Sequence, residues 1–554
     1  MNNMPHHHYR QFPPVQLPDR VWPTKTIDKA PTWCAVDLRD GNQALINPMD
    51  PVRKMRLFKQ LVKLGFKEIE VGFPAASRDD FDFTRQLIEE NLIPDDVTIQ
   101  LLTQAREHLI RRSFEAIAGA KRAIVHIYNS TSPLQRRVVF GMGRQEIIKL
   151  AVDGVHLIRE LAAETDSDIR LQYSPESFSA TELDFSVEIC QAVMEAWGAS
   201  REKPVILNLP STVESATPNV YADQIEWFCR HLPNLAGAII SIHPHNDRGT
   251  AVAAAELAVM AGAQRVEGTL FGNGERTGNV DLVTLAMNLF SQGVDPKLDF
   301  SNIQEVVDTF EECSGLPVHP RHPYSGDLVF TAFSGSHQDA IQKGLRALKE
   351  SGSSGWDVPY LPINPSHLGR EYETFIRINS QSGKGGVAFI LEEIFGFRLP
   401  PGIVQEFSRS VQAMADDLGR ELQPEEIHGA FEKSYLAPPT GIELISYDHK
   451  PVSGKDIICR LSGVLRHSSE TAEFSAEGSG PVSALVEALE GVIKTPIKIN
   501  SFEQHGIGEG RHAKAVAYVS LELNGSSPHF GVGLHSNTTT SALEAVIRAV
   551  SRSM

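Results

Sequence analysis

The sequence has no apolar run of about 18 residues, the length that a membrane-crossing helix requires. Its N-terminus lacks the apolar core of a secretory signal peptide, and its five cysteines form no CxxC pair. Basic residues are in the minority, with 52 Lys and Arg against 69 Asp and Glu, and they form no basic stripe. These absences predict a soluble protein of the reduced cytoplasm, without a membrane span or a nucleic-acid partner.

The composition is that of a large folded protein, with 41% hydrophobic and 22% charged residues in a chain of 554. Such a chain is too long for one hydrophobic core, so several domains are expected. From Thr32 to about Phe290, short β-branched runs alternate with amphipathic stretches, which is typical of successive βα units. We therefore predict an α/β fold with a (β/α)8 TIM barrel over residues 31–305, in preference to a doubly wound sheet of five or six strands. The eight predicted strands are residues 32–37, 66–73, 98–103, 122–128, 169–174, 204–209, 238–243 and 265–271.

The remaining chain divides into three further parts. Residues 1–30 form an N-terminal extension, residues 306–438 a helical linker region, and residues 439–554 a C-terminal α+β domain. The last part contains an internal repeat, because residues 478–489 resemble residues 531–546, and this predicts two ββα modules. A GxG turn precedes each helix; it either binds a carboxylate at the helix N-terminus or only makes a tight turn.

A candidate metal site ends the seventh predicted strand. His243 and His245 are two residues apart on a strand and so project to the same side. The loop after the first strand adds the carboxylate of Asp40 and the permanently charged, planar guanidinium of Arg39. Singly, these residues have plain explanations as packed histidines and a surface turn. Because active sites of barrels lie at the C-terminal ends of the strands, their shared position favours a catalytic divalent metal.

Further polar side chains recur at the same ends of the predicted strands. A random scatter of polar residues would not choose one end of the barrel. These residues are His126, Glu176, Thr212, Asn273, Glu275 and Asn279. The glycine-rich segment 271–279 lacks the GxGxxG spacing and follows the last strand, so it does not predict a dinucleotide site.

At these residues the sequence resembles the DRE-TIM metallolyase superfamily, whose barrel opens with a D-x-R-[DE]-G-x-Q loop and whose ligands include an HxH pair. Residues 37–43 match that loop. Within the superfamily, residues 69–74, 243–247 and 272–279 are similar to those of 2-isopropylmalate synthases in their longer form, which carries a C-terminal leucine-binding domain. The resemblance covers about residues 20 to 554.

The resemblance implies a condensation of acetyl-CoA with 2-oxoisovalerate, followed by thioester hydrolysis to 2-isopropylmalate and CoA, the first committed step of leucine biosynthesis. It implies that Asp40, His243, His245 and Asn279 bind a divalent metal, Mg²⁺ first and otherwise Mn²⁺ or Zn²⁺, with K⁺ as an activator. Arg39 would stabilise negative charge on reacting oxygens. The expected substrate-binding residues are Arg39, Gln43, Leu102, Tyr128, Ser174, Asn208 and Thr212, of which Thr212 holds the carboxylate of the oxo acid.

Removal of a proton from the acetyl methyl group requires a base, and four residues are candidates. Glu176 and His126 come from the barrel, whereas His337 and Tyr372 would come from the linker of the other subunit of a homodimer. Without the resemblance, His337 is a surface histidine at the start of a helix. The sequence does not rank the four.

The resemblance also implies feedback inhibition by leucine, bound near Gly531 and Gly533. Many shorter relatives carry an acidic residue where this chain has residues 534–536, Leu-His-Ser. Citramalate and homocitrate synthases are the nearest alternatives, although Leu102 and Tyr128 suit a branched apolar substrate. An acyl-CoA lyase or aldolase on the same barrel and a leucine-binding regulator with an inactive barrel are more distant alternatives.

Overall fold

The computed structural model describes residues 4–553 except 333, 373–383, 419–421, 453–457, 468–469, 509 and 511–512. The chain forms two compact units, Met1–Phe330 with Ile363–Glu371 and Thr331–Pro362 with Tyr372–Met554. Among the described residues, no helix is long and apolar enough to span a membrane. The domain boundaries expected from the sequence remain predictions.

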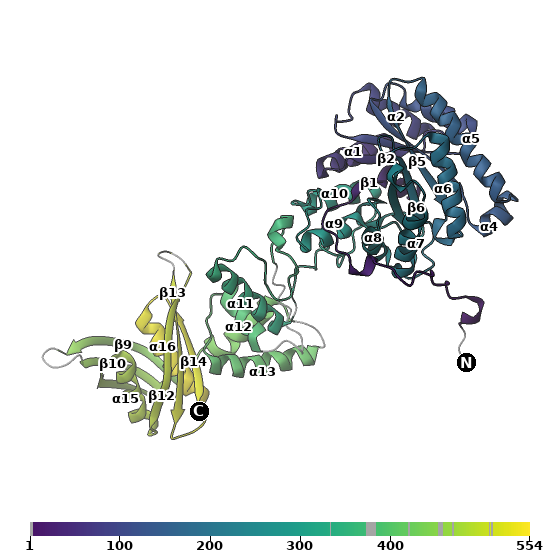
Figure 1. The fold of residues 1–554 in the computed structure, drawn as a ribbon. Helices are drawn as coiled ribbons and strands as arrows, with labels where there is room; N and C mark the ends of the chain where they lie inside the picture. The colour runs from purple at the N-terminus through teal and green to yellow at the C-terminus, as the bar shows by residue number, and fades with distance from the viewer. Residues whose placement is uncertain are drawn as a thin grey trace. The chain divides into compact units, whose positions relative to one another are not determined.

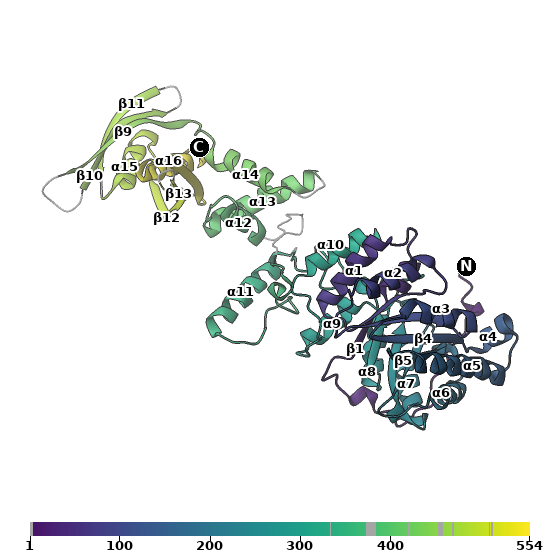
Figure 2. The ribbon, with the colours of Figure 1, turned by 90° about the horizontal axis from the view of Figure 1, so that it is seen from above.

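The first unit is a closed barrel of eight parallel strands in chain order, in which β8 pairs with β1. Figures 1 and 2 show the barrel strands with helices around them. All eight predicted strands are present, so the predicted barrel is confirmed. The strands are β1 Thr32–Ala35, β2 Glu68–Gly72, β3 Thr98–Gln104, β4 Arg122–Ser130, β5 Asp168–Glu176, β6 Val205–Ser211, β7 Ala238–Pro244 and β8 Arg265–Gly268.

Helices surround these strands, and the first helix shows how the sequence sets its ends. Asp50 accepts a hydrogen bond from the backbone N–H of Arg53, Pro51 occupies the first helical position, and Gly65 ends the helix with a φ of 103°. The helices of this unit are α1 Pro51–Leu64, α2 Arg78–Glu89, α3 Glu107–Ile117, α4 Pro133–Gln135, α5 Arg144–Ala163, α6 Leu183–Trp197, α7 Pro218–His231, α8 Ala251–Met260, α9 Leu282–Ser291 and α10 Ile303–Ser314.

The barrel interior holds charged side chains among its apolar ones. Arg265 is 1% exposed and contacts Glu68 through Nε at 2.6 Å and Glu267 through Nη1 at 2.8 Å. Arg170 adds a second cation to Glu68 at 2.7 Å. Because each buried charge has an opposite partner, the interior can carry ionised carboxylates up to the C-terminal ends of the strands.

The second unit consists of linker helices followed by two α+β modules. Within its described residues each module contains three strands and a helix, so the predicted pair of modules is present and each carries one strand more than the repeat predicts. Its elements are α11 Gly335–Ser351, α12 Lys384–Glu393, α13 Pro401–Leu418 and α14 Pro424–Phe431, then β9 Ile442–Val452, β10 Ile458–His467, β11 Glu470–Gly478 and α15 Pro481–Ile493, then β12 Ile497–Ile507, β13 Lys514–Leu523, β14 His529–His535 and α16 Thr538–Ser553.

The two GxG segments differ in structure, which corrects one prediction. Gly480 caps α15 directly after β11, as expected. Gly531 and Gly533, however, lie inside β14 and not in a turn. A Cβ atom at either position would collide with a backbone carbonyl oxygen of α16, which belongs to Ala545 and Ser541 respectively. These glycines therefore allow the strand to pack closely on the helix, and a role in leucine binding remains a prediction.

Candidate active site

A cavity of about 270 Å³ lies at the C-terminal ends of the barrel strands. It brings together every barrel residue that the sequence predicted for the site except Asn273 and Asn279. It is lined by Arg39, Asp40, Gln43, Phe73, Leu102, His126, Tyr128, Ser174, Glu176, Asn208, Pro210, Thr212, His243, His245, Glu275 and Arg276. Asn279 is buried and forms a backbone β-bridge with His245.

Asp40, His243 and His245 form a buried cluster on one side of this cavity. The Nε2 atoms of His243 and His245 lie 3.2 and 3.6 Å from the same Asp40 oxygen, Oδ2. One donor atom from each of the three side chains lies within 4.8 Å of the other two. His243 in β7, His245 just beyond the end of β7 and one carboxylate thus converge on one point, as the HxH spacing predicts.

The turn after β1 places Asp40 at this point. Residues Asp37–Gly41 form a single π-turn, η3, in which the N–H of Asp40 donates to the carbonyl of Val36 at 2.9 Å. The buried carboxylate of Asp37 accepts a hydrogen bond from the N–H of Leu270 at 2.9 Å. This bond ties the turn after β1 to the segment after β8.

Arg39 lies between two carboxylates. Its Nε is 2.6 Å from Glu70 Oε2, and its Nη1 is 2.8 Å from Asp40 Oδ1. Burial raises the pKa of Asp40, but the Arg39 guanidinium and the two histidines outweigh it and hold that pKa well below its usual range. Asp40 is therefore an anionic oxygen donor at neutral pH. Gln43 donates a further hydrogen bond to Asp40 Oδ1 at 3.2 Å.

Both ring nitrogens of His243 face carboxylates. Nδ1 lies 2.8 Å from Glu267 Oε2, on the side of the ring opposite Asp40. Burial lowers the pKa of His243, but the hydrogen bonds with Asp40 and Glu267 raise it to about 9. Without a metal the imidazole thus carries a proton between Nε2 and Asp40. A cation that replaced this proton would meet a nitrogen and an oxygen ligand at the same point.

The donor set fits a divalent metal with open coordination positions. Two imidazoles and a carboxylate are ligands of this class, and the Glu267 contact fixes the ring of His243 as carboxylates do behind metal-bound histidines. Asn279 supports this fit because its Oδ1 atom is buried and has no hydrogen-bond partner in the described part of the chain. Among the described residues, this cluster is the one group of three or more His, Cys, Asp or Glu side chains with such convergence.

Two buried carboxylates of the site, Glu70 and Glu267, were missed in the sequence analysis. Both are fully buried and contact predicted site residues, Glu70 with Arg39 and His126, and Glu267 with His243. The sequence signal that could have revealed them is a charged residue at every second position of a strand that is otherwise apolar, as in β2 and β8. That pattern places a carboxylate inside the barrel but does not name its partner.

On the other side of the cavity, His126 is held at both ring nitrogens. Nδ1 lies 2.9 Å from Glu70 Oε1 and Nε2 lies 2.7 Å from the Ser174 hydroxyl. Asn208 donates to the same hydroxyl at 3.0 Å. Glu176 exposes its carboxylate to the cavity and accepts a hydrogen bond from Ser130. Of the four candidate bases, His126 and Glu176 therefore line this cavity.

Thr212 is oriented by one defined hydrogen bond. Its Oγ1 atom accepts from the N–H of Ser177 at 2.9 Å, so the hydroxyl proton is available to an acceptor in the cavity. Leu102 lines the same cavity, with Tyr128, whose hydroxyl accepts from Gln104 Nε2 at 3.0 Å. The cavity thus combines hydrogen-bond donors with an apolar wall.

His337 and Tyr372 belong to the second unit and are described only within it. His337 is exposed in the first turn of α11 and stacks on the ring of Tyr360, with ring centroids 4.0 Å apart. The Tyr372 hydroxyl is buried without a hydrogen-bond partner among the described residues. The proposed contribution of both residues to the active site remains a prediction.

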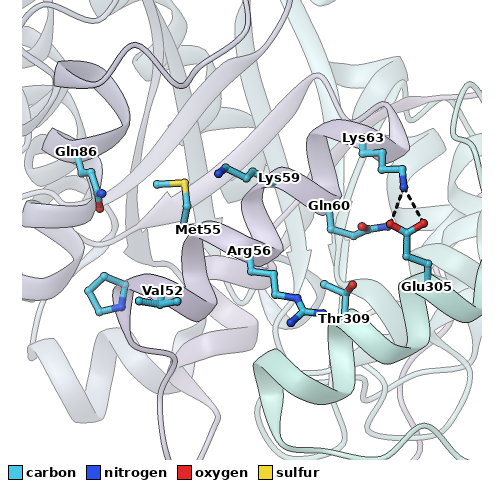
Figure 3. A pocket seen from close by; sticks show the side chains of 10 residues that line it. Val52, Met55, Arg56, Lys59, Gln60, Lys63, Gln86, Glu305 and Thr309 are labelled. Carbon is cyan, nitrogen blue, oxygen red and sulfur yellow. Dashed lines mark hydrogen bonds and ion pairs between the residues drawn. The ribbon is translucent and has the colours of Figure 1, made fainter.

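A larger hollow of about 670 Å³ lies on the outside of the barrel and is lined by side chains of α1 and α10 with Gln86 of α2 (Figure 3). Of its charged side chains, Lys63 pairs with Glu305 at 2.5 Å and Arg56 pairs with Glu312. They do not converge on a common point in the close view. The smaller cavity, at the ends of the barrel strands, is therefore the candidate active site.

Comparison with known proteins assigns three families along the chain. Residues 30–310 match the HMGL-like family, residues 327–392 the alpha-isopropylmalate synthase post-catalytic domain-like family, and residues 421–554 the LeuA allosteric (dimerisation) domain. A solved HMG-CoA lyase of Bacillus subtilis is 20% identical, with 52% of this chain and 95% of that chain covered and a TM-score of 0.42.

Full-length relatives are much more similar. The 2-isopropylmalate synthase of Rhodospirillum rubrum is 57% identical over 544 residues, which are 98% of this chain and 97% of that protein. The enzyme of the same name from Ralstonia nicotianae is 54% identical over 546 residues, 98% of this chain and 94% of that protein. The chain therefore belongs to the 2-isopropylmalate synthase family, whose members are acyltransferases of leucine biosynthesis.

Proposed function

We propose that this enzyme condenses acetyl-CoA with 2-oxoisovalerate and hydrolyses the CoA thioester, releasing 2-isopropylmalate and CoA. Asp40, His243, His245 and Asn279 hold the divalent metal, which we take to be Mg²⁺. The observation that carries the proposal is the convergence of both histidines on Asp40 beside the Arg39 guanidinium, at the mouth of a closed barrel of this family.

When bound, the metal would supply a Lewis acid and a template for the oxo acid. The chain's own groups bind and orient the substrates. The Thr212 hydroxyl donates to the carboxylate of the oxo acid, because its oxygen is already occupied by the N–H of Ser177. Arg39 donates to an oxygen that gains negative charge as the carbon–carbon bond forms.

The branched side chain of 2-oxoisovalerate packs against the apolar wall of the cavity. Phe73, Leu102 and Pro210 contribute this wall together with the ring of Tyr128. Pyruvate, the substrate of a citramalate synthase, would leave part of the wall uncovered, at a cost of about 1 to 3 kcal/mol in transition-state binding. The preference for 2-oxoisovalerate over pyruvate should therefore be about 10- to 200-fold in kcat/KM.

Glu176 and His126 are the barrel groups that can accept the proton of the acetyl methyl group. Each faces the cavity, Glu176 with its carboxylate and His126 with a ring held by Glu70 and Ser174. His337 and Tyr372 act from the linker of the second subunit of a homodimer. Exchange of the acetyl-CoA methyl protons with solvent deuterium, measured in Glu176→Gln, His126→Gln, His337→Ala and Tyr372→Phe variants, identifies the base, because exchange is lost in its variant alone.

The experiment that tests the proposed function is an assay of CoA release from acetyl-CoA with each of 2-oxoisovalerate, pyruvate and 2-oxoglutarate. We expect 2-oxoisovalerate to give the highest kcat/KM, chelation to abolish release, and added Mg²⁺ to restore it. A higher kcat/KM with pyruvate or 2-oxoglutarate would reassign the enzyme as a citramalate or homocitrate synthase. Full activity in the presence of chelator would overturn the metal site.

Glu267→Gln is expected to lower metal affinity about 10- to 100-fold, because carboxylates behind metal-bound histidines contribute that much. The substitution removes the negative charge that contacts Nδ1 of His243 at 2.8 Å. Isothermal titration with Mn²⁺ measures the change. Glu68→Gln is the matched control, since Glu68 is also a buried carboxylate bound to Arg265 but contacts no proposed metal ligand among its described partners. Equal losses in both variants would mean that Glu267 acts only through barrel stability.

His337→Ala is expected to lower kcat by about 100-fold or more, the usual contribution of a positioned acid or base, and to leave metal affinity unchanged. His337 is exposed within its own unit, so its removal should not unfold the chain. Steady-state kinetics and metal titration of the same preparation give the two readouts. Wild-type turnover in this variant would remove His337 from the reaction.

Removal of residues 439–554 is expected to abolish inhibition by leucine. Gly531 and Gly533 lie in this segment, where β14 packs on α16. The linker helices share a hydrophobic core with β13 and β14, and this core includes Phe407, Phe431, Val516 and Val532. The truncated chain is therefore examined by circular dichroism and for residual turnover before leucine is added. Inhibition at the same leucine concentration as in the full chain would refute the assignment.

A further inference from the structure

Arg276, at the rim of the cavity, joins the segments that follow three barrel strands. Its Nε lies 2.6 Å from Asp247 Oδ1 and its Nη2 lies 3.2 Å from Asp247 Oδ2. The same Nη2 donates to the backbone carbonyl of Thr212 at 2.5 Å. One guanidinium thus connects the loop after β8 with the loops after β6 and β7.

The backbone of Arg276 adopts a conformation that side chains other than glycine rarely take. Its φ is 55°, between Gly274 and Gly278, which also have positive φ values. Such a conformation is disfavoured and persists where the surrounding structure holds it. Here it aims the guanidinium at Asp247 and Thr212, while the neighbouring Glu275 accepts a hydrogen bond from Gln43.

The segment that starts at Thr212 is held from two sides. Arg276 holds the carbonyl of Thr212, and Asp247 Oδ2 accepts the N–H of Glu214 at 3.0 Å. The N–H of Ser177 fixes the Thr212 hydroxyl, whose proton is left for the cavity. The direction of that proton therefore depends on where the Arg276–Asp247 pair holds the backbone.

We infer that Arg276 is a positioning residue that sets the Thr212 hydroxyl against the carboxylate of the 2-oxo acid and so determines oxo-acid affinity. This inference rests on the proposed function. A simple surface ion pair would contribute little, since exposed pairs are weak. Arg276 differs because its planar fork binds a carboxylate and a carbonyl together, which a lysine cannot do in the same geometry.

The test compares Arg276→Gln and Arg276→Lys in the full-length, metal-loaded enzyme. The KM for the 2-oxo acid should rise about 10-fold in both, with kcat and the KM for acetyl-CoA within about twofold of wild type, because loss of uniform binding raises KM alone. Arg53→Gln is the matched control. Arg53 also joins a carboxylate, that of Asp50, to backbone carbonyls, and its side chain is about as exposed as that of Arg276. Arg53 does not line the cavity, so Arg53→Gln should leave the kinetics unchanged.

A double-mutant cycle separates positioning from general stability. In a Thr212→Val background, Arg276→Gln should raise the KM for the oxo acid less than twofold further, because the hydroxyl that Arg276 orients is already absent. If Thr212→Val and Arg276→Gln instead raise this KM by factors that multiply, the inference is overturned. A wild-type KM for the oxo acid in Arg276→Gln, or in Arg276→Lys, would also overturn it. The cycle uses whichever 2-oxo acid the wild type converts fastest, so failure with 2-oxoisovalerate overturns the proposed function only.

Discussion

Asp40→Asn and His245→Ala are each expected to lower kcat by about a thousandfold and to remove tight binding of the divalent metal. A metal that polarises the reacting carbonyl contributes several kcal/mol of transition-state stabilisation, and about 4 kcal/mol corresponds to that factor. Asp40 is the point on which both histidine Nε2 atoms converge, at 3.2 and 3.6 Å. Loss of its charge therefore affects all three donors.

The measurements for these variants are CoA release and metal content after dialysis. His231→Ala is the matched control, because His231 is an exposed histidine that stacks on Trp227 in α7 and does not line the cavity. It should keep full activity and metal content. A His245→Ala enzyme that retained both would show that the metal, if required, is held elsewhere.

Arg39→Gln is expected to lower kcat by about 100- to 1000-fold, the range for loss of one donor that stabilises developing charge. The substitution also leaves the fully buried Glu70 without its cationic partner. Burial already raises the pKa of Glu70, and Arg39 is the first of the groups that bring it below its usual value. The single variant should therefore also unfold at a lower temperature.

A second substitution separates these two effects of Arg39. In the double variant Arg39→Gln/Glu70→Gln the buried charge of Glu70 is also removed, and Asp40 keeps its contacts with His243 and His245, so the unfolding temperature should return toward the wild-type value. Turnover should remain low, because the donor for the reacting oxygen is still absent. Recovery of activity together with stability would assign Arg39 a structural role alone.

The sequence predicted the barrel because parallel strands buried on both sides recur at regular spacing. The pair His243 and His245 was visible for the same reason, since a period of two residues places both side chains on one face. Strand β7 ends at Pro244, so His243 lies within the strand and His245 directly follows its end. Asp40 and Arg39 were predicted from a short motif, and the π-turn that aims them became evident only in the structure.

Other features depend on contacts between distant strands, which periodicity does not reveal. Glu267 is in β8 and its partner His243 is in β7, while Glu70 in β2 contacts His126 in β4. The glycines of β14 resembled a turn because a strand that packs closely on a helix and a turn both require small residues. Most residues of β11 are exposed, so its sequence lacks the apolar alternation of a strand, and the repeat was predicted with one strand too few.

The most direct test of the central claim is electron paramagnetic resonance of the full-length chain loaded with Mn²⁺. We predict one bound Mn²⁺ per chain and broadening of its signal by 2-oxoisovalerate labelled with ¹⁷O at the keto and carboxylate oxygens. The Asp40→Asn and His245→Ala variants should show neither effect, and His231→Ala should show both. Mn²⁺ that binds equally well without Asp40 and His245, or a signal that labelled 2-oxoisovalerate does not change, would contradict the account.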